Sequence, residues 1–340
     1  MIIPIDIFPY IINYSRHKGA SRLMRLNKEF KLLVKKHYTI IKQEITCNLH
    51  QLIITFPKII KIRISPRANI LDSDFENINN IEYLNMALCK QPTITNIAFR
   101  NLTRLKHLNL QGACGHWIGG HHFTDEMFLY LTQLEWLYID DNHVITNEGI
   151  KLLTNITNLS IHNCCNISND GLENLTTLTK LDIYNLVRLS DNVFIKLFNL
   201  EELNITFASF TSTIYKYLPK LKKLSLCGLS TINFSEINIL TNLTYLSLCY
   251  VKIKYSELKS LSHIRHISFY GCNFTSDEEV LPLFLLENVQ ILSIYECTIT
   301  IEDILPLNQL KCLNKLNIYR CKNIKFDEET QLKKIFPFFN

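Results

Sequence analysis

Apolar residues along most of the chain follow a short pattern, apolar-x-x-apolar-x-apolar, which recurs every 21 to 29 residues. Twelve copies occur from about residue 59 onward, with their last apolar residue at Ile64, Met86, Leu110, Ile139, Ile161, Ile183, Ile205, Leu226, Leu248, Phe269, Ile294 and Ile318. The last two apolar residues of a copy are two positions apart, which places both on one face of a short β-strand. Each copy therefore predicts a half-buried strand.

A segment with the features of a short helical turn follows many of these strands. In residues 145–153 and 167–175, Thr146 and Ser168 are placed to cap such a turn, and Thr300 with Asp303 has the spacing of a capping box. One copy cannot bury its own apolar face, so the copies must stack. The pattern predicts a curved solenoid with a parallel sheet on its concave side and helical turns on the other side.

These copies resemble the leucine-rich-repeat family over roughly residues 59 to 325. The family usually carries Asn or Cys just after the strand, a position held here by Cys89, Cys164, Cys272, Cys297 and Cys321. The cysteines stand one copy apart instead of in C-x-x-C pairs, which favours packing over metal binding. The resemblance implies an α/β horseshoe, with a leucine-rich-repeat solenoid over residues 46–325 and a C-terminal cap at 326–340.

The first 45 residues have the apolar spacing of helices, with basic residues between the apolar positions. The order of Ile3-Pro4, two further apolar positions and a later Leu-x-x-Leu-x-x-x-Phe run resembles an F-box. That resemblance implies docking on a Skp-type adaptor of a cullin ubiquitin ligase through Pro4, Ile7, Phe8, Ile11, Leu23, Leu26 and Phe30. The alternative is that these helices only cap the open edge of the solenoid.

Charge and composition narrow the classes of partner and compartment. The net charge of +5 arises within residues 1 to 50, where nine Lys and Arg face three acidic residues, and the rest of the chain is nearly neutral. A basic stripe for a phosphate backbone is therefore not expected over most of the chain, which argues against nucleic-acid binding. No signal peptide is visible, no apolar run is long enough for a bilayer, and the cysteine count of 11 is odd. We expect an intracellular, cytoplasmic protein with reduced thiols.

Side chains that flank the apolar pair of each strand should form columns on the concave face. Tyr and Trp are common at binding hot spots because they bury a large area at low entropic cost. The expected partner surface consists of Trp136, Tyr138, Asp140, His162, Tyr184, Phe207, Tyr245, Tyr270, Tyr295 and Tyr319. The alternative is that these rings stack on their neighbours for stability alone.

The third copy is the longest and contains Cys114, His116, Trp117, His121 and His122. Their spacing matches no established zinc pattern, and the glycines among them favour an inserted contact loop over a metal site. The sequence also contains no phosphate loop, nucleophile elbow or His-Glu-x-x-His motif. We therefore expect no enzyme and no cofactor. The resemblances imply the substrate-recognition subunit of an SCF-type ubiquitin ligase, and the alternative is a docking or inhibitory solenoid without a ligase connection.

Overall fold

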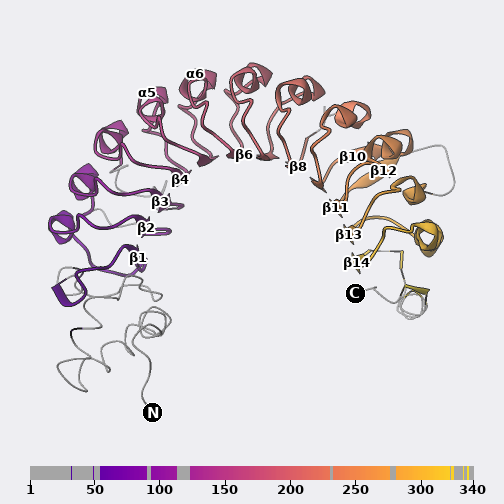
Figure 1. The fold of residues 1–340 in the computed structure, drawn as a ribbon, viewed down its shortest axis with the longest axis horizontal. Coiled ribbons are helices and arrows are strands. Elements are labelled where there is room, and N and C mark those ends of the chain that lie inside the picture. The colour runs from indigo at the N-terminus through magenta and orange to yellow at the C-terminus, as the bar shows by residue number, and fades with distance from the viewer. Residues whose placement is uncertain are drawn as a thin grey trace, which may run out of the picture. The chain divides into compact units, whose positions relative to one another are not determined.

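The computed structural model describes residues 54–89, 93–112, 123–229, 233–275 and 281–321, together with the single positions 32, 49, 323, 324, 332, 335 and 336. The chain divides into two compact units, Met1–Leu175 and Thr176–Asn340. Within each unit, strands lie along one side and short helices lie along the other, as Figure 1 shows.

The first unit contains a parallel sheet whose strands follow one another in chain order. The strands are β1 (Lys61–Arg63), β2 (Tyr83–Asn85), β3 (His107–Leu110), β4 (Trp136–Asp140) and β5 (Asn158–His162). The helices are η1 (Asp72–Phe75), η2 (Asn96–Phe99), η3 (Asp125–Leu129), α5 (Asn147–Lys151) and α6 (Asn169–Leu172). Every strand is thus followed by one short helix, as the sequence pattern predicts.

The second unit repeats this arrangement with seven strands in its main sheet. These are β6 (Lys180–Tyr184), β7 (Glu202–Thr206), β8 (Lys223–Cys227), β9 (Tyr245–Cys249), β11 (His266–Tyr270), β13 (Ile291–Tyr295) and β14 (Lys315–Tyr319). A separate parallel pair joins β10 (Lys252–Lys254) to β12 (Asn273–Thr275). The helices are η4 (Asp191–Ile195), η5 (Ser212–Tyr217), η6 (Phe234–Ile239), η7 (Tyr255–Leu261), η8 (Leu283–Leu285), α7 (Ile301–Ile304) and η9 (Leu305–Gln309).

The core of each unit is built from the predicted apolar triplets. All three apolar positions are buried in every one of the twelve copies, and each strand contains at least the second of them. In register, Leu137 of β4 lies beside Leu108 and Leu159, so identical positions stack from copy to copy. The helices differ from the expectation only in type, since most are 3-10 turns. Such turns suit segments too short for a regular α-helix.

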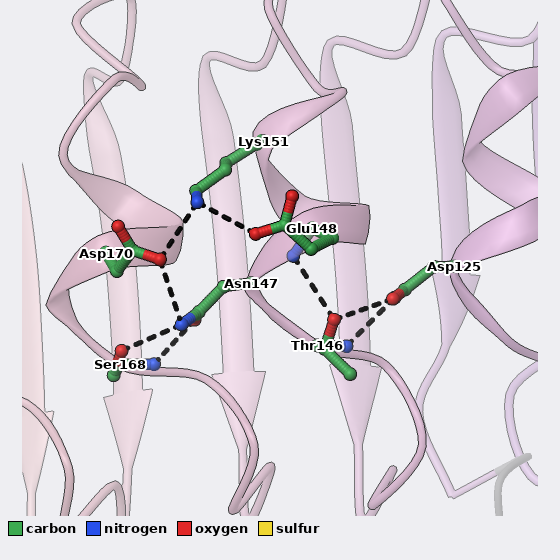
Figure 2. A network of polar contacts seen from close by, with 7 residues as sticks. All are labelled: Asp125, Thr146, Asn147, Glu148, Lys151, Ser168 and Asp170. Carbon is green, nitrogen blue, oxygen red and sulfur yellow. Dashed lines mark hydrogen bonds and ion pairs between the residues drawn. The ribbon is translucent and has the colours of Figure 1, made fainter.

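The helices are joined to one another by a ladder of polar side chains. Asp125, the first residue of η3, accepts hydrogen bonds from the backbone N (2.9 Å) and Oγ1 (2.7 Å) of Thr146 in the next copy. The Thr146 Oγ1 also accepts from the backbone N of Glu148, so it caps α5 as predicted. Figure 2 shows these contacts. The start of η3 therefore also fixes the start of α5.

The next step of the ladder corrects one prediction. Ser168 stands at the N-cap of α6, but its side chain makes no capping bond to that helix. Instead, its backbone N donates to Oδ1 of Asn147 and its Oγ accepts from Nδ2 of Asn147, both at 2.9 Å (Figure 2). The capping box of Thr300 and Asp303 is present as predicted.

Two glycines make room for this ladder. A Cβ atom at Gly149 would lie 2.1 Å from Oδ1 of Asp125, and one at Gly171 would lie 2.7 Å from Oδ1 of Asn147. Both distances are far below van der Waals contact. Glycine is therefore required at these positions for steric reasons, because the preceding copy fills the space that a side chain would need.

Most residues of the column after the strands are buried, and its buried Cys and Asn side chains form hydrogen bonds. Cys272 Sγ donates to the carbonyl of Leu248 at 3.1 Å, and Cys164 Sγ donates to the carbonyl of His162 at 3.3 Å. The cysteines of this column are buried and form no disulfide bonds with one another, in agreement with the packing role predicted for them. Asn142 fills the same column: its Oδ1 accepts from the backbone N of Ile145, and its Nδ2 donates to the carbonyl of Phe123.

Candidate functional site

The strand face of the first unit carries a continuous series of rings. Neighbouring ring centroids lie 5.8 Å apart from Tyr83 to His107, 5.9 Å from His107 to Trp136, 6.5 Å from Trp136 to Tyr138 and 5.2 Å from Tyr138 to His162. All five residues are half-buried. The rings meet at tilted or edge-on angles, so each is held by its neighbours and keeps part of its surface exposed.

Charged groups lie at the margins of this ring series. Lys61 Nζ lies 5.8 Å from the centroid of Tyr83, a cation–π distance. Burial lowers the pKa of His107 against the opposing charge of Glu135, so the imidazole is neutral at pH 7. Burial and the neighbouring Asp141 raise the pKa of Asp140. The face therefore combines a largely neutral aromatic surface with charged groups at its edges.

The second unit carries two further ring clusters on the same side of its strands. Tyr184 and Phe207 meet edge-on at 5.7 Å, and Tyr250 meets Tyr270 edge-on at 5.3 Å. Tyr270 then lies 6.4 Å from Tyr295. Hydrogen bonds with the side chains of Tyr250 and Glu296, the second of which is an acceptor, raise the pKa of Tyr270 to about 12, so its hydroxyl is protonated at neutral pH.

Large side chains at the end of several strands adopt a backbone conformation that they rarely take. Leu88, Phe207 and Tyr250 have φ angles of 62°, 50° and 53°, and are 58%, 51% and 56% exposed. Such left-handed conformations cost on the order of 1 to 3 kcal/mol for residues other than glycine. The same left-handed position recurs two residues after the last apolar residue in eleven of the twelve copies, so it belongs to the repeat itself. The exposure of three large side chains at this position makes this rim of the strand face a candidate binding surface.

A glycine in the following copy accommodates each of these side chains. A Cβ at Gly228 would lie 2.4 Å from the ring of Phe207, and one at Gly271 would lie 2.4 Å from the ring of Tyr250. The same relation holds between Gly112 and Leu88, at 2.8 Å. The exposed apolar side chains therefore lie on a backbone surface that has no side chain of its own.

A pocket of about 500 Å³ opens beside Tyr250. Its lining residues are Tyr250, Gly271, Cys272, Asn273, Glu296, Thr298 and Arg320. The guanidinium of Arg320 lies 5.1 Å from the Tyr319 ring centroid, and its Nη1 lies 3.6 Å from Oε1 of Glu296. The pocket is thus lined by the Tyr250 ring and by Gly271, and the weakly paired Arg320 guanidinium lies at its edge. This combination suits the side chain of a macromolecular partner.

The predicted surface residues fall into several clusters. Trp136, Tyr138 and His162 join the first-unit series, with Asp140 at the end of β4, and Tyr184 pairs with Phe207. Tyr270 and Tyr295 form part of the cluster beside the pocket, and Tyr319 lies under Arg320. Tyr245 lies apart from these clusters, at the start of β9 between Lys223 and His266.

Three residues of the surface were missed by the sequence reasoning. Tyr83 and His107 occupy the first position of their strands. Trp136 and Tyr245 occupy the same position, but this column was not compared from copy to copy. Tyr250 follows β9 at the left-handed position. A systematic count of the aromatic residues at the first strand position would have found the first two.

Other predicted sites lie outside the described residues. These are the adaptor-docking residues Pro4, Ile7, Phe8, Ile11, Leu23, Leu26 and Phe30, and the Cys114 to His122 loop. Within the described ranges, no three His, Cys, Asp or Glu side chains come together as a metal site. No helix in the described part of the chain is both long and apolar enough to cross a membrane.

Comparison with known proteins supports the fold assignment. No protein-family model matches this sequence, and no curated protein matches it. An internalin (inlF) from Listeria monocytogenes str. 4b F2365 is similar in structure, with a TM-score of 0.60 and 18% identity over 95% of both chains. The structure of a TLR13-ssRNA13 complex has a TM-score of 0.52 and 17% identity, over 96% of this chain and 60% of that chain. Together with the repeated copies within each unit, these likenesses show that the chain has the leucine-rich-repeat fold.

Proposed function

We propose that the protein binds a partner protein through the strand faces of its repeats. The observation that carries this proposal is the series of half-buried rings from Tyr83 to His162, together with the clusters around Phe207 and Tyr250. Rigid aromatic side chains with partly exposed surfaces are typical anchors of protein interfaces. The exposed large side chains of Leu88, Phe207 and Tyr250 at the strand ends support the same proposal.

The charge distribution favours a protein over a nucleic acid. Several lysines at and before the starts of strands are neutralised within the chain: Lys106 pairs with Glu135 at 3.0 Å, and Lys180 and Lys223 both pair with Glu202. A phosphate backbone is bound chiefly by unpaired Lys and Arg. The RNA in the TLR13 complex is a ligand of TLR13. In the present chain, the neutral aromatic face favours contacts with a protein.

We further propose that residues 1–45 form an F-box-like module that docks on a Skp-type adaptor of a cullin ubiquitin ligase. Its support is the sequence resemblance at Pro4, Ile7, Phe8, Ile11, Leu23, Leu26 and Phe30. In this proposal the repeats of residues 46–325 present a substrate protein, residues 326–340 close the array, and the ligase chemistry lies in other subunits. The protein would then act in the cytoplasm, without a cofactor and without catalysis of its own.

Adaptor binding by the full chain tests this assignment. The intact protein, an Ile7→Asp variant and a Leu26→Asp variant would each be titrated with purified Skp-type adaptor. Val187→Asp is the matched control, because Val187 is 81% exposed and lies among the repeats. We expect the intact chain and the control to bind and both N-terminal variants to lose binding.

Failure of the intact, folded chain to bind would remove the ligase assignment. The proposal for the strand face would remain, and the protein would be a docking or inhibitory solenoid with a helical cap. Binding that persists in both N-terminal variants would place adaptor contacts elsewhere and contradict the F-box assignment.

A further inference from the structure

On the helix side, a column of asparagines connects five of the copies to the preceding one. These residues stand just before the first apolar residue of their copies, and their Nδ2 atoms donate to backbone carbonyls one copy earlier. The pairs are Asn80 with Pro57, Asn155 with Thr132, Asn199 with Thr176, Asn242 with Pro219 and Asn288 with Ser262, at 2.8 to 3.4 Å. The column satisfies carbonyls that the short helices leave without a helical partner.

His263 occupies the same position in its copy, where several other copies also carry a residue other than Asn. Its Nε2 is buried and has no hydrogen-bond partner among the residues that the structure describes. Burying a polar nitrogen without a partner costs about 1 to 3 kcal/mol, so an unpaired group of this kind calls for an explanation. The same residue lines a pocket of about 570 Å³, formed by Asn238, Thr241, Ser256, Lys259, Ser260, Ser262 and His263.

The pocket offers hydrogen-bond donors and positive charge. All seven lining side chains are able to donate a hydrogen bond, and none is a carboxylate. Lys259 is exposed, and its ammonium forms no ion pair with any residue of the described ranges. The pocket therefore contrasts with the starts of β6, β7 and β8, where the lysines are paired with a glutamate.

Several acceptors near the pocket are already engaged. The carbonyl of Ile239 accepts from the backbone N of Thr241, and that of Lys259 accepts from the backbone N of Ser262. The carbonyl of Ser262 accepts from both the backbone N and Nδ2 of Asn288. These bonds reduce the negative potential that the ends of η6 and η7 would otherwise present.

The carboxylate of η7 is also engaged elsewhere. Glu257 is buried, and its two oxygens accept from the backbone N of Phe234 and of Lys254. It does not line the pocket. The groups left to interact with a ligand are thus the ammonium, the imidazole, the amide and the hydroxyls.

We infer that this pocket binds a phosphate group carried by a small molecule or by a modified side chain. A phosphate monoester has three strong acceptor oxygens and a charge of about −1.5 to −2 at pH 7, which matches a set of donors around one free ammonium. The volume exceeds what a bare phosphate ion fills, so the group is expected to belong to a larger ligand. This site is independent of the strand face and of the adaptor proposal.

Calorimetric titration of the full chain tests the site. The probes are inorganic phosphate, O-phosphoserine, serine and acetate, at constant ionic strength. The variants are Lys259→Ala and His263→Asn, the second of which introduces the residue that five other copies carry at this position. Lys216→Ala is the matched control, because Lys216 stands five positions before Leu221 as Lys259 stands five before Ile264.

We expect saturable binding of O-phosphoserine and weak or no binding of serine and acetate. Lys259→Ala and His263→Asn should each weaken binding about tenfold or more, whereas Lys216→Ala should leave it unchanged. Binding of inorganic phosphate with equal affinity would identify a free phosphate compound as the ligand, and preference for O-phosphoserine would identify a phosphorylated chain. No saturable phosphate binding, or equal weakening by the Lys216 control, would overturn the inference.

Discussion

The two sides of the repeats use their side chains differently. On the helix side, the polar side chain at the start of one helix is fully hydrogen-bonded to the next copy, as in the two bonds between Asp125 and Thr146. On the strand side, rings such as Trp136 and Tyr138 touch their neighbours at an edge and keep part of their surface exposed. A regular column of side chains can therefore serve either of two roles. Where its polar groups are all hydrogen-bonded within the chain, the column is structural, and where its members keep exposed surface, it is available to a partner.

The largest expected effect comes from filling the space that the helix ladder uses. Gly149→Ala would bring a methyl group within 2.1 Å of Oδ1 of Asp125, so the ladder must shift or break. We expect a loss of about 2 kcal/mol in the free energy of unfolding, measured by urea denaturation. An unchanged stability would show that the ladder adjusts freely and does not constrain the copies.

Removing the ladder carboxylate itself should have a somewhat smaller effect. Asp125→Ala leaves the backbone N and hydroxyl of Thr146 without their acceptor, which should cost about 1 to 2 kcal/mol. Asp125→Asn keeps one acceptor oxygen and should cost less. Asp191→Ala provides the matched test in the second unit, because Asp191 contacts Thr211 in the same way. Thermal denaturation followed by circular dichroism would rank the variants.

A buried hydroxyl on the helix side should reduce stability at alkaline pH. The hydroxyl of Tyr215 is buried and has no hydrogen-bond partner within the described part of the chain. Burial raises its pKa above the ordinary value of 10.0, with smaller contributions from Glu236 and Glu257. On the strand side, burial raises the pKa of Cys227 to about 11. The unfolded chain therefore loses these protons first, so stability is complete below the unfolded pKa values and falls as pH rises through the folded ones.

Tyr215→Phe separates this contribution from other alkaline effects. Removing the unpaired hydroxyl should raise the free energy of unfolding by about 1 kcal/mol at neutral pH. It should also make the decrease above about pH 9 less steep. Urea denaturation at several pH values would measure both, and identical pH profiles for the two proteins would contradict the assignment to Tyr215.

The smallest stability effect is expected at the rim of the strand face. Phe207→Gly removes an exposed ring but relieves a φ of 50°, which glycine adopts without strain. The two changes should nearly cancel and leave stability within about 1 kcal/mol. A loss comparable to that of Gly149→Ala would mean that the ring is structural, and the rim would lose its support as a binding surface.

The repeat pattern predicted most of the fold because the signal lies within each copy. The position of an apolar triplet such as Leu134, Leu137 and Ile139 is sufficient to place a strand and its buried face. The helix ladder was not predicted, since the partner of Asp125 is Thr146, 21 residues away, and local capping rules consider only neighbours three residues apart.

The candidate surface was predicted only in part, for a related reason. Following two strand columns found Tyr138 and Tyr270, whereas Tyr83 and His107 stand in the first column. The left-handed position of Tyr250 depends on the room that Gly271 provides in the next copy. The need for a glycine opposite Tyr250 is apparent only when two copies are stacked. The pocket beside Tyr250 therefore could not be predicted from the sequence of one copy.

Site-specific photo-crosslinking tests the central claim that partners bind on the strand side. A photoreactive phenylalanine analogue would be placed at Trp136 on β4 or at Leu152, which follows α5 on the helix side of the same copy and is 40% exposed. We predict protein adducts from the Trp136 position in cell extracts and none above background from the Leu152 position. Equal adducts from both positions, or adducts from the helix side alone, would contradict the assignment of the strand face as the binding surface.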